Sequence, residues 1–508
     1  MRRQIVGQGI ERNLVKSVDK ENLAVMKDET IGIRSADVDK AYEQLERNFE
    51  DLSSEKREKE IVKRIIALEK LYLQTTKDTI CRSAGKGVKS LQKLKKEADE
   101  TLRLTTSQEL VCELQDKLFS IQNGQIRGVD KRRITDLKRI GHESVMGNVF
   151  SGKVDGESDI FLFKVSSFSY TANDLMLHEL VAGLNLNSLR KVGIPNFCLS
   201  YGSFMCGPPV VENDKVVDWC TKSNNKVAYI MYENLTDAIS AGDYIQTASP
   251  QQTLSLILQI AMSISSANTY FASLPGAKDR YPFTHYDLHS QNVLMRKVEN
   301  VDVMQIPYFS ATGREFYLTA DRIATIIDYG TSYVNGYGEP STSTRARGQS
   351  NTEGFPLHDI FKFICSLAKY YRGNNQGVKS ILVACIRFFT KEPIDSFLNN
   401  MSKHYFSLPK YKEIEGYTVE MFINYLGALF EKNNPTFWTG IVSIKKNPEI
   451  HFLDTKSYAP KKTLSLEEVV MEEEVVEPLP PQPKQQKKRS SFLMSETGTI
   501  LRKNRVVS

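Results

Sequence analysis

The sequence lacks the features that would mark a membrane, secreted or zinc-binding protein. It has no long uninterrupted apolar stretch and no apolar N-terminal segment, so neither a membrane span nor a secretory signal is predicted. Its seven cysteines are scattered and include no Cys-x-x-Cys pair, which predicts free thiols in a reducing compartment and no zinc site. The net charge of +6 is small and spread along the chain, and it does not indicate a specific nucleic-acid partner. We therefore expect an intracellular, cytoplasmic protein.

At 508 residues the chain is too long for one ordinary domain, since domains run to about 100–200 residues. Residues 1–130 are rich in Lys, Glu and Leu, with apolar side chains at helical steps, which predicts a helical extension. Its apolar runs are too short for a long coiled coil, so packing on the rest of the chain and helix-mediated association both remain open. Residues 456–508 combine an acidic block, a proline cluster and a basic cluster, and we expect a disordered tail.

The strongest chemical pattern lies in the middle of the chain. His-Tyr-Asp-Leu-His-Ser-Gln-Asn at 285–292 is followed, after an apolar run, by Asp-Tyr-Gly at 328–330. Phosphoryl transfer needs a carboxylate near the acceptor hydroxyl and oxygen ligands for the magnesium that bridges the nucleotide phosphates. Asp287 suits the first role, and Asn292 and Asp328 suit the second. Either pattern alone would more often be an ordinary loop or turn than a catalytic site, but their order and spacing together indicate phosphoryl transfer.

These residues resemble the catalytic loop and metal-binding motif of the protein-kinase-like superfamily. The resemblance implies an α+β, bilobal protein-kinase-like fold, with a small lobe at 131–236 and a large lobe at 237–455. It implies that ATP and Mg²⁺ (or Mn²⁺) bind between the lobes. Asp287 would then orient the substrate hydroxyl and accept its proton, and Asn292 and Asp328 would hold the metal. His285 would brace the loop.

The resemblance also implies a nucleotide-binding lobe upstream. Gly147 and Val149 match the last glycine and the following valine of the kinase glycine-rich loop, whereas the earlier glycines are missing and Gly141 is the nearest. An ordinary β-hairpin would look the same. Lys164 lies in an apolar, strand-like run fifteen residues after Val149, and Glu179 follows fifteen residues later on an expected helix. Lys164 would hold phosphate oxygens and Glu179 would fix Lys164; a solvated helix-face glutamate is the alternative.

Three further elements follow from the same resemblance. The apolar run at 227–232 leads into Glu233 and Leu235, in the place of the kinase hinge, whose backbone groups would meet the adenine edge. Apolar residues at helical spacing over 254–267 predict a buried core helix. Asp359 begins a helix where protein kinases bury an aspartate that braces the catalytic loop. An exposed Asp in a first helical turn is an equal alternative, because acids favour that position.

Departures from the family pattern concern the substrate. His289 stands where most protein kinases carry a lysine two residues after the catalytic Asp, as in haspin-like kinases and in aminoglycoside and choline kinases. The metal-binding Asn and Asp are 36 residues apart, which predicts an enlarged hairpin with extra strands near 308–309 and 316–318. Residues 331–354 resemble an activation segment, but no Ala-Pro-Glu closes them. With the helix that starts near Asp359, the pattern is similar to the kinases of large nucleocytoplasmic DNA viruses, of iridovirus type.

The leading expectation is a serine/threonine protein kinase that acts on protein substrates. His289 indicates a small-molecule hydroxyl kinase as the enzyme alternative, and the irregular glycine loop indicates a pseudokinase scaffold. Intact Lys164, Asp287, Asn292 and Asp328 argue against the scaffold, while the extension and the tail favour protein partners over a metabolite. If the protein is viral, its location would be the host cytoplasm or the virion.

Overall fold

The computed structural model describes residues 90–453, except for 103, 123–124, 145–146, 159, 167–169, 213–214, 224–225, 274–280, 299–300, 310–314, 335–353, 391–416 and 444–450. All of these residues belong to one of the two units of the chain, Met1–Glu473. Most of the expected helical extension, most of the expected activation segment and all of the expected tail lie outside the described residues.

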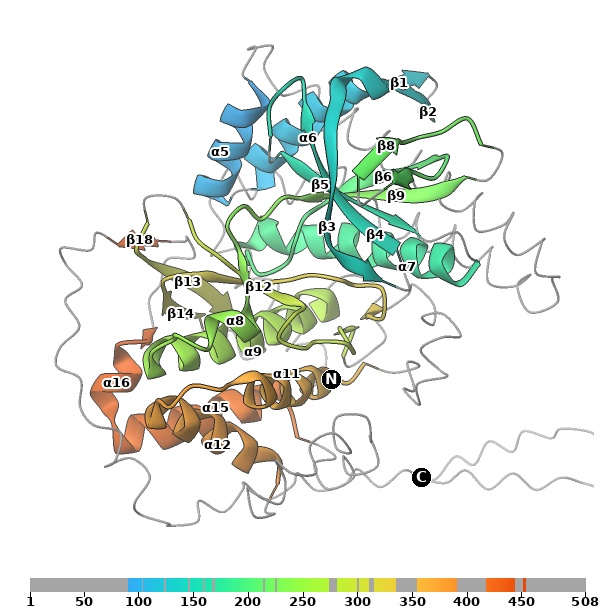
Figure 1. The fold of residues 1–508 in the computed structure, drawn as a ribbon. Helices are drawn as coiled ribbons and strands as arrows, with labels where there is room; N and C mark the ends of the chain where they lie inside the picture. Colours follow the sequence, from blue (N-terminus) through green and yellow to red (C-terminus); the bar gives the residue numbers. More distant parts are fainter. Residues whose placement is uncertain are drawn as a thin grey trace, which may run out of the picture. The chain divides into compact units, whose positions relative to one another are not determined.

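Two helices precede the first lobe (Figure 1). α5 (Leu91–Thr101) begins at Ser90, whose hydroxyl accepts a hydrogen bond from the Lys93 amide, as helix N-caps do. α6 (Leu104–Leu118) follows after a short break. Their leucines are buried with the strands of the sheet that comes next. This part of the chain therefore packs on the small lobe, which was one of the two alternatives for the extension.

The small lobe is built on an antiparallel sheet of seven strands in the order β6-β9-β5-β4-β3-β8-β7. Its strands are β3 (Ile134–Ser144), β4 (Gly147–Val154), β5 (Phe161–Ser166), β6 (Ser200–Cys206), β7 (Val210–Glu212), β8 (Lys215–Asp218) and β9 (Val227–Glu233). The hairpin β1 (Phe119–Gln122) and β2 (Gln125–Val129) and the 3₁₀ helix η2 (Lys131–Arg133) precede it. On β5, Phe161, Phe163 and Val165 are buried in an aromatic core, so the alternation of a strand places Lys164 on the opposite face. α7 (Tyr170–Leu186), continued by the 3₁₀ helix η3 (Asn187–Val192), packs against β5, β6 and β9.

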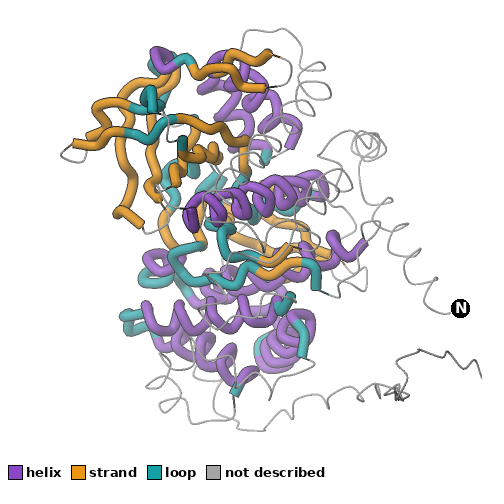
Figure 2. The backbone as a smooth tube through the Cα atoms, turned by 90° about the vertical axis from the view of Figure 1, so that its right-hand side faces the viewer, coloured by secondary structure: helices purple, strands orange, loops and turns teal. Residues whose placement is uncertain are grey.

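The large lobe is mainly helical and surrounds one long helix. α9 (Pro250–Ser273) is buried along most of its length, which confirms the core helix expected over 254–267. The other helices are α8 (Ala241–Tyr244), α11 (Pro356–Tyr370), α12 (Gln376–Phe389), α15 (Val419–Asn433) and α16 (Pro435–Thr439). Figure 2 shows strands gathered in the upper part of the described chain and helices dominating the lower part. This is the α+β, bilobal arrangement that the sequence predicts.

Short strands of the large lobe flank segment 285–292 and precede Asp328. β10 (Ile239–Ser240), β12 (Val293–Arg296) and β15 (Ile323–Ile326) form one small sheet, and β11 (Phe283–Thr284) pairs with β16 (Tyr333–Val334). A four-stranded sheet holds β13 (Val303–Phe309), β14 (Glu315–Ala320), β17 (Val442–Ser443) and β18 (His451–Leu453). The antiparallel pairing of β13 with β14 confirms the enlarged hairpin. Among the described residues, no helix combines the length and apolar character needed to cross a bilayer.

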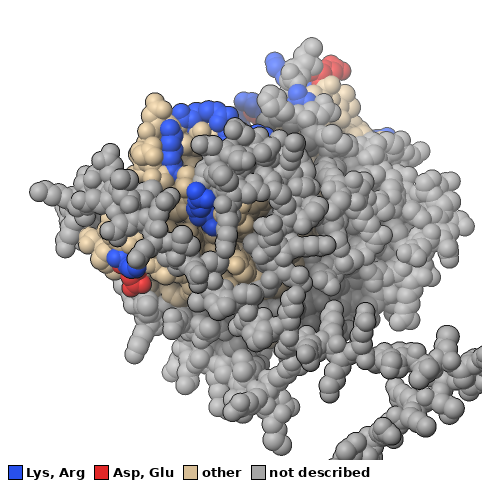
Figure 3. All heavy atoms as spheres, turned by 90° about the horizontal axis from the view of Figure 1, so that it is seen from below, with Lys and Arg blue, Asp and Glu red and all other residues tan. Residues whose placement is uncertain are grey.

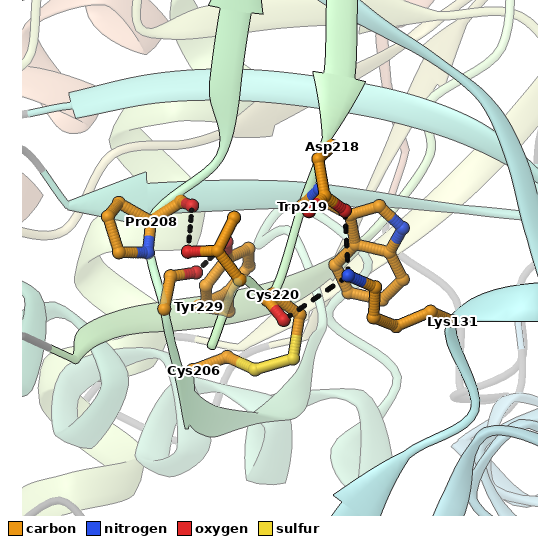
Figure 4. Close-up of a disulfide and its surroundings, with 9 residues drawn as sticks. Lys131, Cys206, Pro208, Asp218, Trp219, Cys220 and Tyr229 are labelled. Atoms are coloured by element: carbon orange, nitrogen blue, oxygen red, sulfur yellow. Dashed lines mark hydrogen bonds and ion pairs between the residues drawn. A yellow bond between two sulfur atoms is a disulfide. The ribbon is translucent and has the colours of Figure 1, made fainter. Parts of the chain in front are cut away.

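The expectation of free thiols is wrong for part of the chain. Cys206, at the end of β6, and Cys220, just after β8, form a disulfide (Figure 4). Cys112 is disulfide-bonded as well, whereas Cys198, Cys365 and Cys385 are free and buried. The Cys206–Cys220 pair is 14 residues apart in the sequence. A search for close Cys-x-x-Cys spacing misses it, because the β7–β8 hairpin brings the two residues together.

The surroundings of this disulfide are fixed by further contacts. Lys131 Nζ is 2.7 Å from Asp218 Oδ1 and 3.4 Å from the Cys220 carbonyl oxygen, and the Tyr229 hydroxyl donates to the Gly207 carbonyl. The sticks in Figure 4 show these groups on both sides of the bond. The disulfide therefore ties the β7–β8 hairpin, at one edge of the sheet, to the end of β6, the strand at the other edge. On the face drawn in Figure 3, the described Lys and Arg side chains form separate groups.

Candidate active site

The catalytic-loop segment, 285–292, connects β11 to β12, and side chains of α11 hold it by hydrogen bonds. The Asp359 carboxylate accepts hydrogen bonds from the backbone amides of His285 (2.6 Å) and Tyr286 (2.8 Å). Asp359 is fully buried, so the alternative of an exposed first-turn aspartate is wrong. Burial raises the pKa of Asp359 to about 7, although the two amide hydrogen bonds oppose that rise. This aspartate braces the loop as the sequence pattern indicates.

His285 lies between the loop and the strand that leads to Asp328. Its Nδ1 accepts a hydrogen bond from the Asp287 amide at 3.3 Å, and its Nε2 is 2.9 Å from the Ile327 carbonyl oxygen. Burial lowers the pKa of His285, which favours the neutral ring that this pair of contacts requires. His285 is thus placed as a brace rather than as a base.

Two hydrogen bonds of Asn292 bring Asp287 and Asp328 near each other, one to the Asp287 backbone and one to Ile327, the residue before Asp328. The Asn292 side-chain nitrogen donates to the Asp287 carbonyl (3.0 Å), and the Asn292 carbonyl accepts from the Ile327 amide (3.0 Å). Asp328 has a left-handed backbone, with φ of 66°, which non-glycine residues adopt rarely, although aspartate tolerates it better than most. The side chains of Asp287 and Asp328 are 28% and 45% exposed. The backbone near both residues is therefore held by hydrogen bonds, while part of each carboxylate is exposed to solvent.

Lys164 links the two lobes at this point. Its Nζ is 2.6 Å from Glu179 Oε2 and 2.7 Å from Asp328 Oδ1. Glu179 also accepts a hydrogen bond from the Tyr232 hydroxyl and is buried, so the solvated-glutamate alternative is wrong. Burial disfavours the ammonium, but the charges of Asp328 and Glu179 outweigh it and raise the pKa of Lys164. The Lys164 charge in turn lowers the pKa of Asp328, which therefore stays ionised.

The glycine hairpin is described in part. Gly147 begins β4 with a φ of +146°, and a Cβ there would lie 2.0 Å from the Val165 carbonyl oxygen, so only glycine fits. Val149 pairs with Lys164 across β4 and β5, and Gly141 belongs to β3. The tip at 145–146 lies outside the described residues. The close approach to β5 alone accounts for glycine at 147, independently of any phosphate.

The Glu233 side chain, at the start of the expected hinge, belongs to a buried ionic cluster. The Glu233 side chain is 3% exposed and forms ion pairs with Arg190 and with Arg296 (3.1 Å), and its backbone amide donates to the Leu199 carbonyl. The Leu235 carbonyl accepts from the Ala238 amide. The Glu233 amide thus already has a partner within the chain. Sequence reasoning missed this buried ionic cluster, because its members share no periodicity.

The residues present fit a divalent cation supported by phosphates. Among the described residues there is no cluster of three or more His, Cys, Asp or Glu side chains that could hold a metal. Magnesium, however, is usually held by one or two carboxylates together with substrate phosphates and water. Asp328 offers an ionised, half-exposed carboxylate. The Asn292 side-chain nitrogen is used within the loop, and its amide oxygen is chemically suited to be a second ligand.

No family model matches the chain. It is 21% identical over 311 residues to "Probable kinase 098L" of Invertebrate iridescent virus 3, covering 59% of this chain and 51% of that protein. The chain thus spans about half the length of the curated relative it matches.

Solved structures similar to the chain include two double mutants of the PknI kinase domain of Mycobacterium tuberculosis, at 12% and 11% identity. Each match covers 58% of this chain and 95% of that domain, with a TM-score of 0.31, which is too low to carry an argument. The motif order, the two lobes and the similarity to the probable iridovirus kinase identify the chain as a divergent kinase-like protein.

Proposed function

We propose that the protein transfers the γ-phosphoryl group of ATP, with Mg²⁺ or Mn²⁺, to serine or threonine hydroxyls of proteins. One observation carries the proposal: Lys164 contacts both Glu179 and Asp328, while Asn292 is hydrogen-bonded to the backbone of Asp287. A cation for phosphate, two metal ligands and a carboxylate for the acceptor hydroxyl are thereby joined in one set of contacts. Phosphoryl transfer depends mainly on such positioning and charge.

Each side chain has a definite task in this reaction. Lys164 would neutralise phosphate oxygens, and Glu179 with Tyr232 keeps the ammonium in place. A divalent cation on Asn292 and Asp328 would offset the charge of the phosphates. Backbone groups near Gly141, Gly147 and Val149 would cover the phosphates, and the Glu233 carbonyl and the Leu235 amide would meet the adenine, since the Glu233 amide and the Leu235 carbonyl have partners within the chain.

At Asp287, the substrate hydroxyl would lose its proton to the carboxylate as its oxygen bonds to the γ-phosphorus. The bond from that phosphorus to the bridging oxygen breaks, and ADP leaves with the electron pair. The exposed side of the Asp287 carboxylate is where the acceptor would enter. Protein acceptors are favoured over small alcohols by the long appendages of the chain.

The test is to incubate the purified full chain with γ-labelled ATP and Mg²⁺ in the presence of casein and histone, and separately of choline and an aminoglycoside. Asp287→Asn should fold normally and lose about 10²–10⁴-fold in transfer. Asp302→Asn, which changes an exposed aspartate of the same lobe, is the matched control. Label on protein Ser or Thr in the wild type and the control, but not in Asp287→Asn, supports the proposal. Label only on a small alcohol favours the alternative kinase, and no transfer at all favours a scaffold.

A further inference from the structure

Three side chains on one face of α11 contact the catalytic loop at successive points. Asp359, Lys362 and Ser366 are spaced by three and four positions and therefore lie on the same side of the helix. Asp359 holds the amides at the start of the loop, and the Ser366 hydroxyl accepts from the Ser290 amide at 2.9 Å near its end. Lys362 stands between them. All three side chains are buried.

Lys362 contacts the loop at its chemical centre. Its Nζ is 2.5 Å from Asp287 Oδ1 and 3.2 Å from the Tyr286 carbonyl oxygen. The Lys362 side chain is 5% exposed, and an ammonium this far removed from water needs a close acidic partner. Among the described residues, Asp287 is the carboxylate within ion-pair distance of it. The contact therefore fixes one oxygen of the carboxylate to which we assign the acceptor hydroxyl.

The loop itself supplies no comparable cation. His289 occupies the position two residues after Asp287, where the resemblance places a lysine. Its Nε2 is 4.0 Å from Asp287 Oδ2, which is beyond hydrogen-bond distance, and its Nδ1 accepts from the Gln291 amide at 3.2 Å. Burial lowers the pKa of His289, so the ring is neutral near pH 7. Asp287 Oδ2 remains the oxygen able to receive a proton.

We propose that Lys362 is the positioning cation of the catalytic loop, supplied from α11 in place of a lysine within the loop. It holds Asp287 Oδ1, turns Oδ2 toward the acceptor hydroxyl, and puts positive charge beside the phosphoryl group in transfer. This inference rests on the proposed function of the same site. The cation beside Asp287 would thus come from a helix of the large lobe, although the sequence of the loop alone contains no lysine for this role.

The first test separates charge from hydrogen bonding. Lys362→Met removes both, whereas Lys362→Gln keeps a donor for the Tyr286 carbonyl but removes the charge. Both should lower kcat about 10²-fold while KM for ATP changes less than about threefold, as expected for loss of an electrostatic contact used in the transition state. Lys369→Met changes an exposed lysine on the same helix and should match the wild type. Thermal melting of each variant shows whether it has folded.

The second test moves the lysine to the loop. The double variant His289→Lys with Lys362→Met restores a cation near Asp287 from the other side, and it should regain at least about tenfold in kcat over Lys362→Met. A purely structural brace between α11 and the loop would not be replaced in this way. Regained activity therefore supports a positioning role through charge.

Several results would overturn the inference while leaving the proposed function intact. These are near-wild-type kcat in Lys362→Met, full activity in Lys362→Gln alone, or no recovery in the double variant. A parallel fall in melting temperature and ATP binding for both single variants would likewise reduce Lys362 to a folding contact. Absence of transfer by the wild type would instead refute the proposed function itself.

Discussion

Lys164 and Asp328 are 164 residues apart in the sequence and form an ion pair of 2.7 Å between Nζ and Oδ1. The lysine side chain is 12% exposed, whereas the aspartate side chain is 45% exposed. The pair therefore has a buried side, where Glu179 holds the ammonium, and an open side, where the carboxylate can meet a metal.

Asp328→Ala should impair the enzyme more than Asn292→Ala. The carboxylate is the stronger ligand for a hard cation, and its loss also removes one of the two anions that contact Lys164. We expect at least about a tenfold larger loss of kcat/KM for Mg²⁺-ATP in Asp328→Ala, measured over a series of Mg²⁺ concentrations. ATP should raise the melting temperature of the wild type only when Mg²⁺ or Mn²⁺ is present. Equal stabilisation by ATP in excess chelator would favour the scaffold alternative.

Glu233→Gln should destabilise the fold. The Glu233 carboxylate is paired with Arg190 and Arg296, and all three side chains are nearly inaccessible to solvent. Removing one partner of a buried ion pair typically costs about 3–5 kcal/mol, because the remaining charge is left without compensation. Denaturant unfolding should show a loss of this order. Glu212→Gln, on the exposed strand β7, should be neutral; a neutral Glu233→Gln would show that the cluster contributes no net stability.

Much of the site could be predicted because the spacing of its residues along the chain is set by local structure. The distances along the chain from Val149 to Lys164 and Glu179, and from Asp287 to Asn292, are set by one strand, one helix and one loop. Each of these elements forms as expected. The β13–β14 hairpin was predictable from the 36-residue gap between Asn292 and Asp328.

The contacts that could not be predicted depend on tertiary register. Arg190, Glu233 and Arg296 come from three separate segments, and Cys206 meets Cys220 only because an inserted hairpin folds back. Lys362 reads as an ordinary helix-face lysine until α11 is placed under the loop. Its spacing of three residues from Asp359 is the signal that could have found it.

Replacing Cys206 and Cys220 together by serine should lower stability without abolishing transfer. The disulfide closes a short loop that contains the β7–β8 hairpin, and closing about 15 residues is worth about 3 kcal/mol in the chain-entropy model. The double variant should unfold at lower denaturant concentration than the wild type. Reductant should lower the unfolding midpoint of the wild type toward that of the double variant. Any effect of reductant on the double variant itself would come from the disulfide of Cys112. Detection of both thiols by alkylation in the native, unreduced protein would contradict the disulfide.

Asp359 should make the stability of the fold depend on pH. Its pKa is raised by burial to about 7 in the folded protein, against about 3.9 in an unfolded chain. Between these values the folded state binds one more proton than the unfolded state, so the free energy of unfolding decreases as pH rises from about 4 to about 7 and then levels off. The slope from this one group is at most about 1.4 kcal/mol per pH unit. Asp359→Asn lacks the titrating carboxyl, so the stability of the wild type relative to this variant should fall between pH 5 and pH 7. Chemical denaturation of both proteins at pH 5, 6, 7 and 8 measures that difference. A difference that is constant, or that grows with pH, would mean that the two amide hydrogen bonds from His285 and Tyr286 keep Asp359 ionised throughout.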